Sequence, residues 1–436
     1  MRKNLWPKAL LAAASLTVLA AAPAQYLGRQ QDDLLYLISA EALSRGHYRL
    51  FTVTGAPPLT MITPGFPLLL LPVTLLFGEN HAAHQAYAAL ALAALPWALW
   101  FWLRRRLDDE TSALVAALAA TSPIALSQSG AVMSEPFYAL IMVALLLTLE
   151  KPASGWLYLL LTQVRPAGLS AAAALDWRRL WPAAVGALLW SAWSYSVSGE
   201  VQELQELRLS FQGQGWLFPL RVAFDNLLFY LSAWGNSYVP FGGLALGTLL
   251  AALAAKGARG PAGLMLAGAG LMHLVWAWQY ERYLLPLLPW LLWGVAVALK
   301  RRAKPALAAL LLAQTALHTW RWALKPSPFA EPELRAAYAW LREHSKPDEA
   351  LASALPVRDG YWAVRPASPL PREDIARRLK SRGVRWVLWQ KDLDVGLSAA
   401  RAAAISVLLE QAEARLSGPE FRLAYEDAQA RIYEVR

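Results

Sequence analysis

Apolar residues gather along the chain into long blocks that are separated by short polar stretches. A helix needs about twenty mostly apolar residues to cross a hydrocarbon core of about 30 Å. The pattern therefore predicts a mostly α-helical, polytopic transmembrane bundle with about nine to twelve spans. We expect the first span at residues 10–22 and the others at residues 85–103, 112–127, 136–149, 182–196, 241–255, 264–278, 284–299 and 306–323.

Two further apolar stretches are interrupted by proline. Residues 63–77 contain three prolines, so we expect a helix that lies at, or dips into, the outer membrane surface. Residues 156–175 are broken at Arg165-Pro166, and both ends of this stretch are expected on the cytoplasmic side. A pair of half-length helices satisfies both ends.

The charge distribution orients these spans. Of the 436 residues, 57% are hydrophobic and only 17% are charged, and the formal net charge is +10. The basic residues form short clusters between apolar blocks, a pattern typical of membrane topology rather than of nucleic-acid binding. We expect four clusters to be cytoplasmic: residues 104–106, 178–179, 256–259 and 300–304.

This topology places two long segments on the outer side of the membrane. Only one full crossing fits between the first span and residues 104–106, which leaves an enlarged outward loop at about residues 25–85. The first span is expected to remain as an anchor, because many spans follow it. We therefore predict a transmembrane domain at residues 1–324, in a cell membrane and most simply a bacterial inner membrane, with residues 325–436 outside.

Residues 325–436 have frequent charges and short apolar runs, which predicts an extracytoplasmic α/β domain. Helices are expected at residues 332–344, 371–382 and 398–416. Strands are expected at residues 351–355, 361–364 and 384–389, followed by two short strands that finish at residue 435.

Several kinds of chemistry are excluded or weakly supported. Cysteine is absent, which excludes disulfides, thiolate metal sites and thiol nucleophiles. His81 and His84 could share a helix face, but no third ligand is near in sequence, so no metal site is predicted. A cofactor is not implied, although a divalent metal could bind at Glu135. A phosphate-cradling glycine loop and a G-x-S-x-G motif are also missing from the sequence.

Two adjacent carboxylates open an apolar stretch in the outward loop. Asp32 and Asp33 precede the apolar run 34–43, and Gly46 ends it, so a helix with two acids in its first turn is predicted. Helix capping explains one Asp. A general base at the membrane surface explains two, because partial desolvation and a like-charged neighbour raise one carboxyl pKa. The residues alone leave both explanations open.

Short motifs then follow in a recognisable order. The outward loop contains Asp32-Asp33-x-x-Tyr36, Gly46-x-Tyr48, Thr63-Pro64-Gly65-Phe66-Pro67 and Phe77-Gly78. Later come Ser134-Glu135-Pro136, Val164-Arg165-Pro166-Ala167-Gly168 and Arg282-Tyr283-Leu284-Leu285-Pro286-x-x-Pro289. Together they resemble the GT-C fold glycosyltransferases, nearest to the aminoarabinose lipid A transferases and protein O-mannosyltransferases.

The resemblance implies transfer of a sugar from a polyprenyl phosphate carrier to an acceptor outside the membrane, with inversion at the anomeric carbon. It assigns the acidic loop position to Asp32, and Asp33 stands where Glu is more usual. Tyr36 and Tyr283 fall in its substrate-binding motifs. Many relatives have Lys or His before a Pro-Pro pair, whereas this chain has Thr63-Pro64-Gly65; this departure bears on the sugar and the acceptor, not on the fold.

Three charged residues have competing explanations. Arg282 could clamp the departing phosphate with its planar fork, or it could snorkel at the membrane interface. Glu135 could orient the acceptor, hold a divalent ion or be a solvated acid at a helix start. Arg165 lies in an apolar block, where an unpaired charge is costly, so we expect it to bind free carbonyls of the broken helix, or else a phosphate or a carboxylate.

We therefore predict a polyprenyl-phosphate-dependent glycosyltransferase with Asp32 as base, Asp33 and Glu135 as supporting acids and Arg282 as phosphate clamp. Its partners are a polyprenyl-phosphate-linked sugar, a lipid, glycan or protein acceptor, and membrane lipids. The acids and Arg282 should converge on one cavity open to the outer leaflet.

The alternatives are a flippase of lipid-linked sugars, which would show repeated broken helices, and an inactive scaffold whose tail recruits a partner. Aromatic residues at 211–218 and 229–234 fit interfacial anchoring or a cavity lining.

Overall fold

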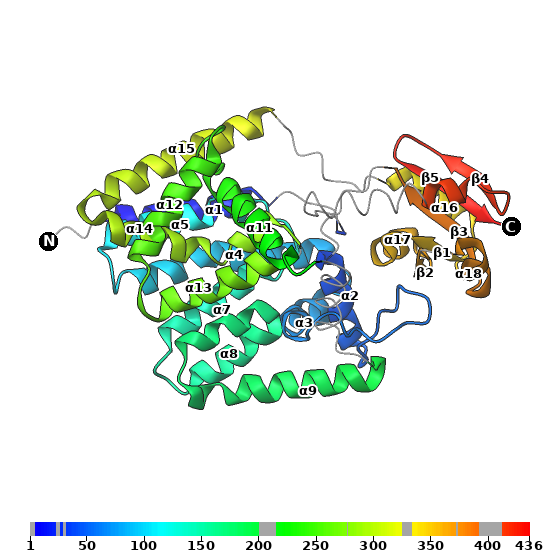
Figure 1. The fold of residues 1–436 in the computed structure, drawn as a ribbon, viewed down its shortest axis with the longest axis horizontal. Helices are drawn as coiled ribbons and strands as arrows, with labels where there is room; N and C mark the ends of the chain where they lie inside the picture. Colours follow the sequence, from blue (N-terminus) through cyan, green and yellow to red (C-terminus); the bar gives the residue numbers. More distant parts are fainter. Residues whose placement is uncertain are drawn as a thin grey trace. The chain divides into compact units, whose positions relative to one another are not determined.

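The computed structural model describes residues 5–22, 27–28, 32–199, 215–276, 278–324, 334–371, 374–391 and 412–436 (Figure 1). Contacts divide the chain into two units. The helical unit consists of Met1–Gln25 and Thr60–Pro328, and the sheet unit consists of Tyr26–Leu59 and Phe329–Arg436. The domain boundaries expected from the sequence remain predictions, and the structure adds that residues 26–59 pack with the carboxyl-terminal segment.

Helices make up almost all of the helical unit. Its described elements are α1 (Trp6–Ala20), α3 (Gly65–Phe77), α4 (His81–Leu103), α5 (Asp109–Ala120), α6 (Pro123–Leu126), α7 (Glu135–Leu147), α8 (Ala153–Val164), η1 (Pro166–Ala174), η2 (Trp177–Arg179), α9 (Trp181–Ser198), α11 (Phe218–Gly235), α12 (Gly243–Gly257), α13 (Gly260–Val275), η3 (Glu281–Leu284), α14 (Leu288–Leu299), η4 (Lys300–Arg302) and α15 (Ala303–Leu324).

Every predicted span contains a helix, and the break at Arg165-Pro166 is also present. Arg165 has an extended backbone (φ −151°, ψ 135°) between α8 and the 3₁₀ helix η1. This conformation is expected before proline, whose ring disfavours the helical region for the preceding residue. In contrast, α11 was not predicted, because Arg221 and Asp225 interrupt its apolar run.

Length and composition single out one helix in the part of the chain that the structure describes. Helix α4 is long and apolar enough to cross a membrane, and α1, α3, α7, α12 and α13 are shorter apolar helices. The structure therefore shows a mostly helical protein, and the polytopic arrangement is taken up below as a proposal.

Helix α3 begins in direct contact with the end of α8. Thr63 Oγ1 donates a hydrogen bond of 2.7 Å to the carbonyl of Gln163. A Cβ on Gly65 would overlap the backbone of Gln163 and Val164. Glycine is therefore required at position 65. The contact holds the start of α3 against Gln163, which is two residues before Arg165 in the sequence.

The sheet unit contains a mixed five-stranded sheet with the order β2-β1-β3-β5-β4. Its elements are α2 (Asp32–Ser44), α16 (Arg335–His344), β1 (Ala350–Ser353), α17 (Pro356–Ala363), β2 (Ala367–Pro369), α18 (Ile375–Ser381), β3 (Val384–Gln390), β4 (Phe421–Glu426) and β5 (Ala430–Val435). Strands β2, β1 and β3 are parallel, and the β4–β5 hairpin pairs antiparallel with β3.

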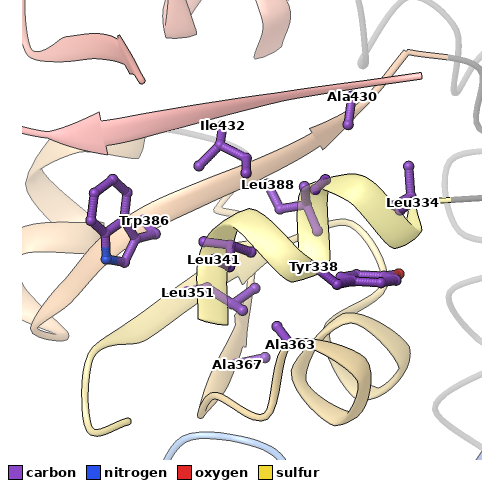
Figure 2. Close-up of a cluster of buried hydrophobic side chains, with 11 residues drawn as sticks. Leu334, Tyr338, Leu341, Leu351, Ala363, Ala367, Trp386, Leu388, Ala430 and Ile432 are labelled. Carbon is purple, nitrogen blue, oxygen red and sulfur yellow. The ribbon is translucent and has the colours of Figure 1, made fainter. Parts of the chain in front are cut away.

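Helices cover both faces of this sheet. On one face Leu341 of α16 packs with Leu351 and Leu388, as Figure 2 shows. On the other face Leu379 of α18 packs with Val387. Burying a leucine of this kind contributes about 2 kcal/mol. The predicted α/β domain is thereby confirmed as a layered sheet with helices on both sides.

One predicted element of the described tail differs from the structure. Residues 361–364 were expected as a strand, but residues 361–363 belong to the helix α17, which Pro356 opens and Val364 ends in a left-handed conformation (φ 55°). The expected helix at 398–416 lies mostly outside the described residues, although residues 412–416 are helical.

Candidate functional site

A buried carboxylate in the helical unit is paired with two arginines. Glu135 is 0% exposed and Arg282 is 5% exposed. Glu135 Oε1 lies 2.7 Å from Nη1 of Arg165 and 3.3 Å from Nε of Arg282. We call these three residues the arginine–glutamate cluster. Its three side chains comprise two guanidinium groups and one carboxylate, which is a formal charge of +1 for the three residues.

The three side chains come from places where helices begin or break. Glu135 is in the first turn of α7, where the helix dipole favours a negative charge. Arg165 is the extended residue between α8 and η1, and its Nη1 also donates to Ser134 Oγ at 3.0 Å. Arg282 is in η3, directly before α14. Irregular backbone thus brings together charges that a continuous helix would separate.

Tyrosine rings surround the two guanidinium groups. Arg282 Cζ lies 4.2 Å from the ring centre of Tyr280 and 5.6 Å from that of Tyr283. Arg165 Cζ lies 5.2 Å from the same Tyr283 ring. His273 packs against Tyr283 with a ring separation of 5.2 Å. The faces of aromatic rings stabilise cations, so the Tyr283 ring packs against the cluster, and its substrate-binding role stays a prediction.

The structure bears on several of the earlier alternatives. Arg165 pairs with the carboxylate of Glu135, one of the kinds of partner considered for it. Glu135 is not a solvated acid, because it is fully buried between two cations. The buried guanidinium of Arg282 lies on Glu135, which argues against simple snorkelling.

One buried polar residue of this region was not identified from the sequence. Asn226 of α11 is fully buried, and its Nδ2 donates to the carbonyls of His273, Leu274 and Trp276 at 3.2, 2.8 and 2.6 Å. These carbonyls end α13, and the chain continues from there to η3 and Arg282. An amide at the start of the apolar run 227–231 was the available signal.

The acidic pair lies in the sheet unit, at the start of α2. Asp33 is 3% exposed, and its Oδ1 accepts hydrogen bonds from the backbone N–H groups of Gly28 (3.0 Å) and Leu34 (2.8 Å). Asp32 is partly exposed. The two acids therefore differ: Asp33 holds the local backbone, and Asp32 remains reachable by solvent.

Two tyrosines of the outward-loop motifs lie near each other on this segment. Tyr36 is buried in α2, and Tyr48 follows the end of the helix, where Gly46 adopts φ +76°. Burial raises the pKa of Tyr48, against the hydrogen bond with Ser39, and Tyr36 raises that pKa further. The turn at Gly46 therefore directs the chain back so that Tyr48 lies near Ser39 and Tyr36 of α2.

An apolar groove of about 450 Å³ lies within the helical unit. Its walls come from the start of α3, from α8 and from α9, and three tryptophans line it: Trp156, Trp190 and Trp193. Gln163, two residues before Arg165, also lines it. The groove is thus largely hydrophobic, and one of its walls comes from the end of α8, which Arg165 follows in the chain.

Metal-binding chemistry finds little support. In the described ranges, no three His, Asp or Glu side chains gather closely enough to hold an ion. His84 Nε2 lies 3.0 Å from Thr74 Oγ1, and its Nδ1 lies 2.9 Å from the carbonyl of Asn80. This histidine therefore links α3 to α4.

The fold is similar to that of solved GT-C glycosyltransferases, the resemblance that the motif order had indicated. No family model and no curated protein matches the sequence. Among solved structures, the chain is similar to ArnT, the aminoarabinose lipid A transferase, from Cupriavidus metallidurans, solved bound to undecaprenyl phosphate. The TM-score is 0.61 at 12% identity, covering 99% of this chain and 98% of that one.

The apo state of the same ArnT gives a TM-score of 0.60 at 12% identity, with 98% of this chain and 97% of that chain covered. The oligosaccharyltransferase of Archaeoglobus fulgidus, in complex with zinc and sulfate, gives 0.53 at 11% identity, with 87% and 68% covered. At these identities the likeness establishes the fold alone.

Proposed function

We propose that this protein is a membrane glycosyltransferase that moves a sugar from a polyprenyl phosphate to an acceptor outside the membrane. The observation that carries the proposal is the buried arginine–glutamate cluster, in a helical unit that also contains a groove lined by tryptophan and leucine. A polyprenyl phosphate has the matching chemistry, because it joins an anionic head to a long hydrocarbon chain.

The cluster is suited to the phosphate. A guanidinium donates two parallel hydrogen bonds to phosphate oxygens, and such charge-assisted bonds are strong in a buried setting. Glu135 and the Tyr283 ring hold Arg165 and Arg282 in place before the ligand binds, which reduces the entropic cost of binding. The ArnT structure bound to undecaprenyl phosphate supports the same donor class.

The chemistry proposed is one inverting displacement. The acceptor hydroxyl attacks the anomeric carbon while its proton passes to the carboxylate of Asp32. The bond between this carbon and the phosphate oxygen breaks, and the electron pair leaves with the polyprenyl phosphate. General base catalysis of this kind contributes about 10² to 10⁴ in rate. The guanidinium groups stabilise the departing phosphate.

The fold class also bears on location. We propose that the apolar helices of the helical unit cross a bacterial inner membrane several times and that the sheet unit lies on the outer side. Two observations support this: the GT-C neighbours are membrane enzymes, and the basic residues 104–106, 256–259 and 300–304 predict cytoplasmic ends of helices. The acceptor is proposed to be an envelope lipid, glycan or protein.

The test is Asp32→Asn, which keeps the shape of the side chain and removes the base. Purified protein in detergent is given a panel of undecaprenyl-phosphate-linked pentoses and hexoses with cell-envelope extract, and release of undecaprenyl phosphate is measured. We expect the rate to fall at least about 10²-fold. The control Glu79→Gln, an exposed acid of the same predicted outward loop, should keep full activity.

Two outcomes contradict the proposal. Full activity of Asp32→Asn removes this residue from the mechanism. A wild-type protein that releases no undecaprenyl phosphate from any donor, yet moves the lipid-linked sugar across vesicle membranes, is a flippase, since a transporter forms no glycosidic bond.

A further inference from the structure

The segment before α2 is bound to helix α17 of the same unit. Trp362 Nε1 donates a hydrogen bond of 2.7 Å to the carbonyl of Leu27. The next residue, Gly28, has φ +93°, and a Cβ built on it would lie 2.8 Å from Cγ of Arg358. Two side chains of α17, four residues apart, therefore contact two consecutive residues of the outward loop.

Hydrogen bonds connect this attached segment to the acidic pair. Asp33 Oδ1 accepts hydrogen bonds from the N–H groups of both Gly28 and Leu34. The carboxylate thus ties the bound residue Gly28 to the first turn of α2, which also contains Asp32. A displacement of Gly28 would move the start of the helix with it.

Arg358 is itself held from several sides. It is 8% exposed, its Nε donates to Asp359 Oδ1 at 2.8 Å, and its Nη2 donates to Gln390 Oε1 at 2.8 Å. Tyr338 of α16 donates to the same Asp359 oxygen at 2.7 Å. The surface that meets Gly28 is therefore rigid, because α16, α17 and β3 all fix it.

A second attachment lies further along the same loop. Val53 forms a parallel bridge with Ala367 of β2. Thr54 N donates to the Ala367 carbonyl at 2.7 Å, and Ala367 N donates to the Thr52 carbonyl at 3.1 Å. The loop thereby adds to the edge of the sheet, and α2 is attached to the sheet unit through the residues on both sides of it.

We propose that Arg358 and Trp362 are positioning residues, through which the carboxyl-terminal α/β segment places Asp32 for catalysis. The inference rests on the proposed function for its catalytic consequence. The structural consequence, that the start of α2 depends on these two side chains, can be tested separately.

The experiment compares Gly28→Ala with Gly383→Ala in the full-length protein. Both glycines have a positive φ, +93° and +66°, but an added Cβ at Gly383 meets no atom within 4 Å. A positive φ is thus common to both variants, and the overlap with Arg358 belongs to Gly28→Ala alone. Trp362→Phe is the second variant, which removes one N–H donor and keeps an aromatic ring.

Hydrogen–deuterium exchange of the amides in 32–44 is the structural readout. We expect exchange to quicken at least about threefold in Gly28→Ala and Trp362→Phe. We expect kcat for sugar transfer to fall about tenfold, because small misplacements of a reacting group are costly. The KM for the donor should change less than about twofold, because the phosphate binds to the arginines. Gly383→Ala should alter none of these quantities.

Unchanged exchange in 32–44 for both variants overturns the inference, and so does an equal effect of Gly383→Ala. These outcomes differ from failure of the proposed function, which is decided by Asp32→Asn. If Asp32→Asn remains active while exchange in 32–44 quickens as expected, the attachment stands and the catalytic role of Asp32 does not.

Discussion

Glu135 is enclosed by the first turn of α7 and by two guanidinium groups, so its charge matters for stability and for ligand binding. We predict that Glu135→Gln lowers the free energy of unfolding by on the order of 3 kcal/mol, because it leaves buried arginines without their counter-charge. It also raises the formal charge of the cluster from +1 to +2. Undecaprenyl phosphate should therefore raise the melting temperature more in the variant than in the wild type.

Thermal unfolding with and without undecaprenyl phosphate measures both effects. Glu110→Gln is a suitable control, because Glu110 pairs with Lys304 at 2.9 Å on a solvent-exposed part of α5. It should lose little stability, since exposed ion pairs contribute little, and its response to the lipid should be that of the wild type. A Glu135→Gln protein as stable as the wild type would show that the arginines do not need this carboxylate.

Helix α11 illustrates how an element can support a site that it does not contain. Asn226 binds three carbonyls at the end of α13, and α11 also contacts η3. We predict that Asn226→Leu lowers the free energy of unfolding by about 1–2 kcal/mol, because the buried carbonyls lose their donor. The start of η3 should shift with them, and the donor KM should rise about three- to tenfold.

Gln314→Leu is the matched control for this variant. Gln314 is also a buried amide, and its Nε2 donates to the carbonyl of Leu118 and to Thr121 Oγ1 between α15 and α5. It should lose comparable stability with no change in donor KM. An equal rise of donor KM in both variants would mean that general loosening of the bundle, rather than the support of η3, explains the effect.

The elements that were predicted correctly have their signal in adjacent residues. Helices such as α4 and α14 follow from local hydropathy, and the break at Arg165 follows from Pro166. Helix α11 was missed because charges interrupt its apolar run, while its burial against α12 and α13 decides its structure. Residues 361–364 favour a strand by residue type, but packing places 361–363 in α17.

The site was predictable only in part for a similar reason. Glu135, Arg165 and Arg282 each stood out as charges beside apolar segments. Their pairing joins three segments that are distant in sequence, so it depends on tertiary packing that no local pattern encodes. Asn226 and the attachment of Gly28 to α17 likewise arise only once the chain is folded.

The β4–β5 hairpin gives a pH-dependent prediction. Hydrogen bonds from Lys391 and Arg431 lower the pKa of Glu426 from 4.5 to about 2. A lowered pKa in the folded state stabilises the hairpin above about pH 4.5, and this contribution is lost as pH falls through about 2. Amides in 421–435 should therefore exchange faster in Glu426→Gln than in the wild type at pH 6, and the difference should shrink steadily at lower pH. A difference independent of pH would exclude this ion pair as its cause.

At the scale of the whole molecule, the proposed orientation can be tested because the chain contains no cysteine. A single introduced cysteine can then be labelled without background. Ser381 is exposed at the end of α18 in the sheet unit. Ala258 is half-exposed between Lys256 and Arg259, in a loop whose basic residues predict a cytoplasmic position. Neither substitution changes a charge.

In spheroplasts treated with a membrane-impermeant maleimide, we expect Ser381→Cys to be labelled and Ala258→Cys to be labelled only after lysis. Opposite sides for the two positions require an odd number of membrane crossings between them, which the helices α13, α14 and α15 can supply. Labelling of both in intact spheroplasts, or of neither, would contradict this topology. Labelling of neither would also place the sheet unit, and with it Asp32, on a side where an acceptor in the outer leaflet cannot be reached.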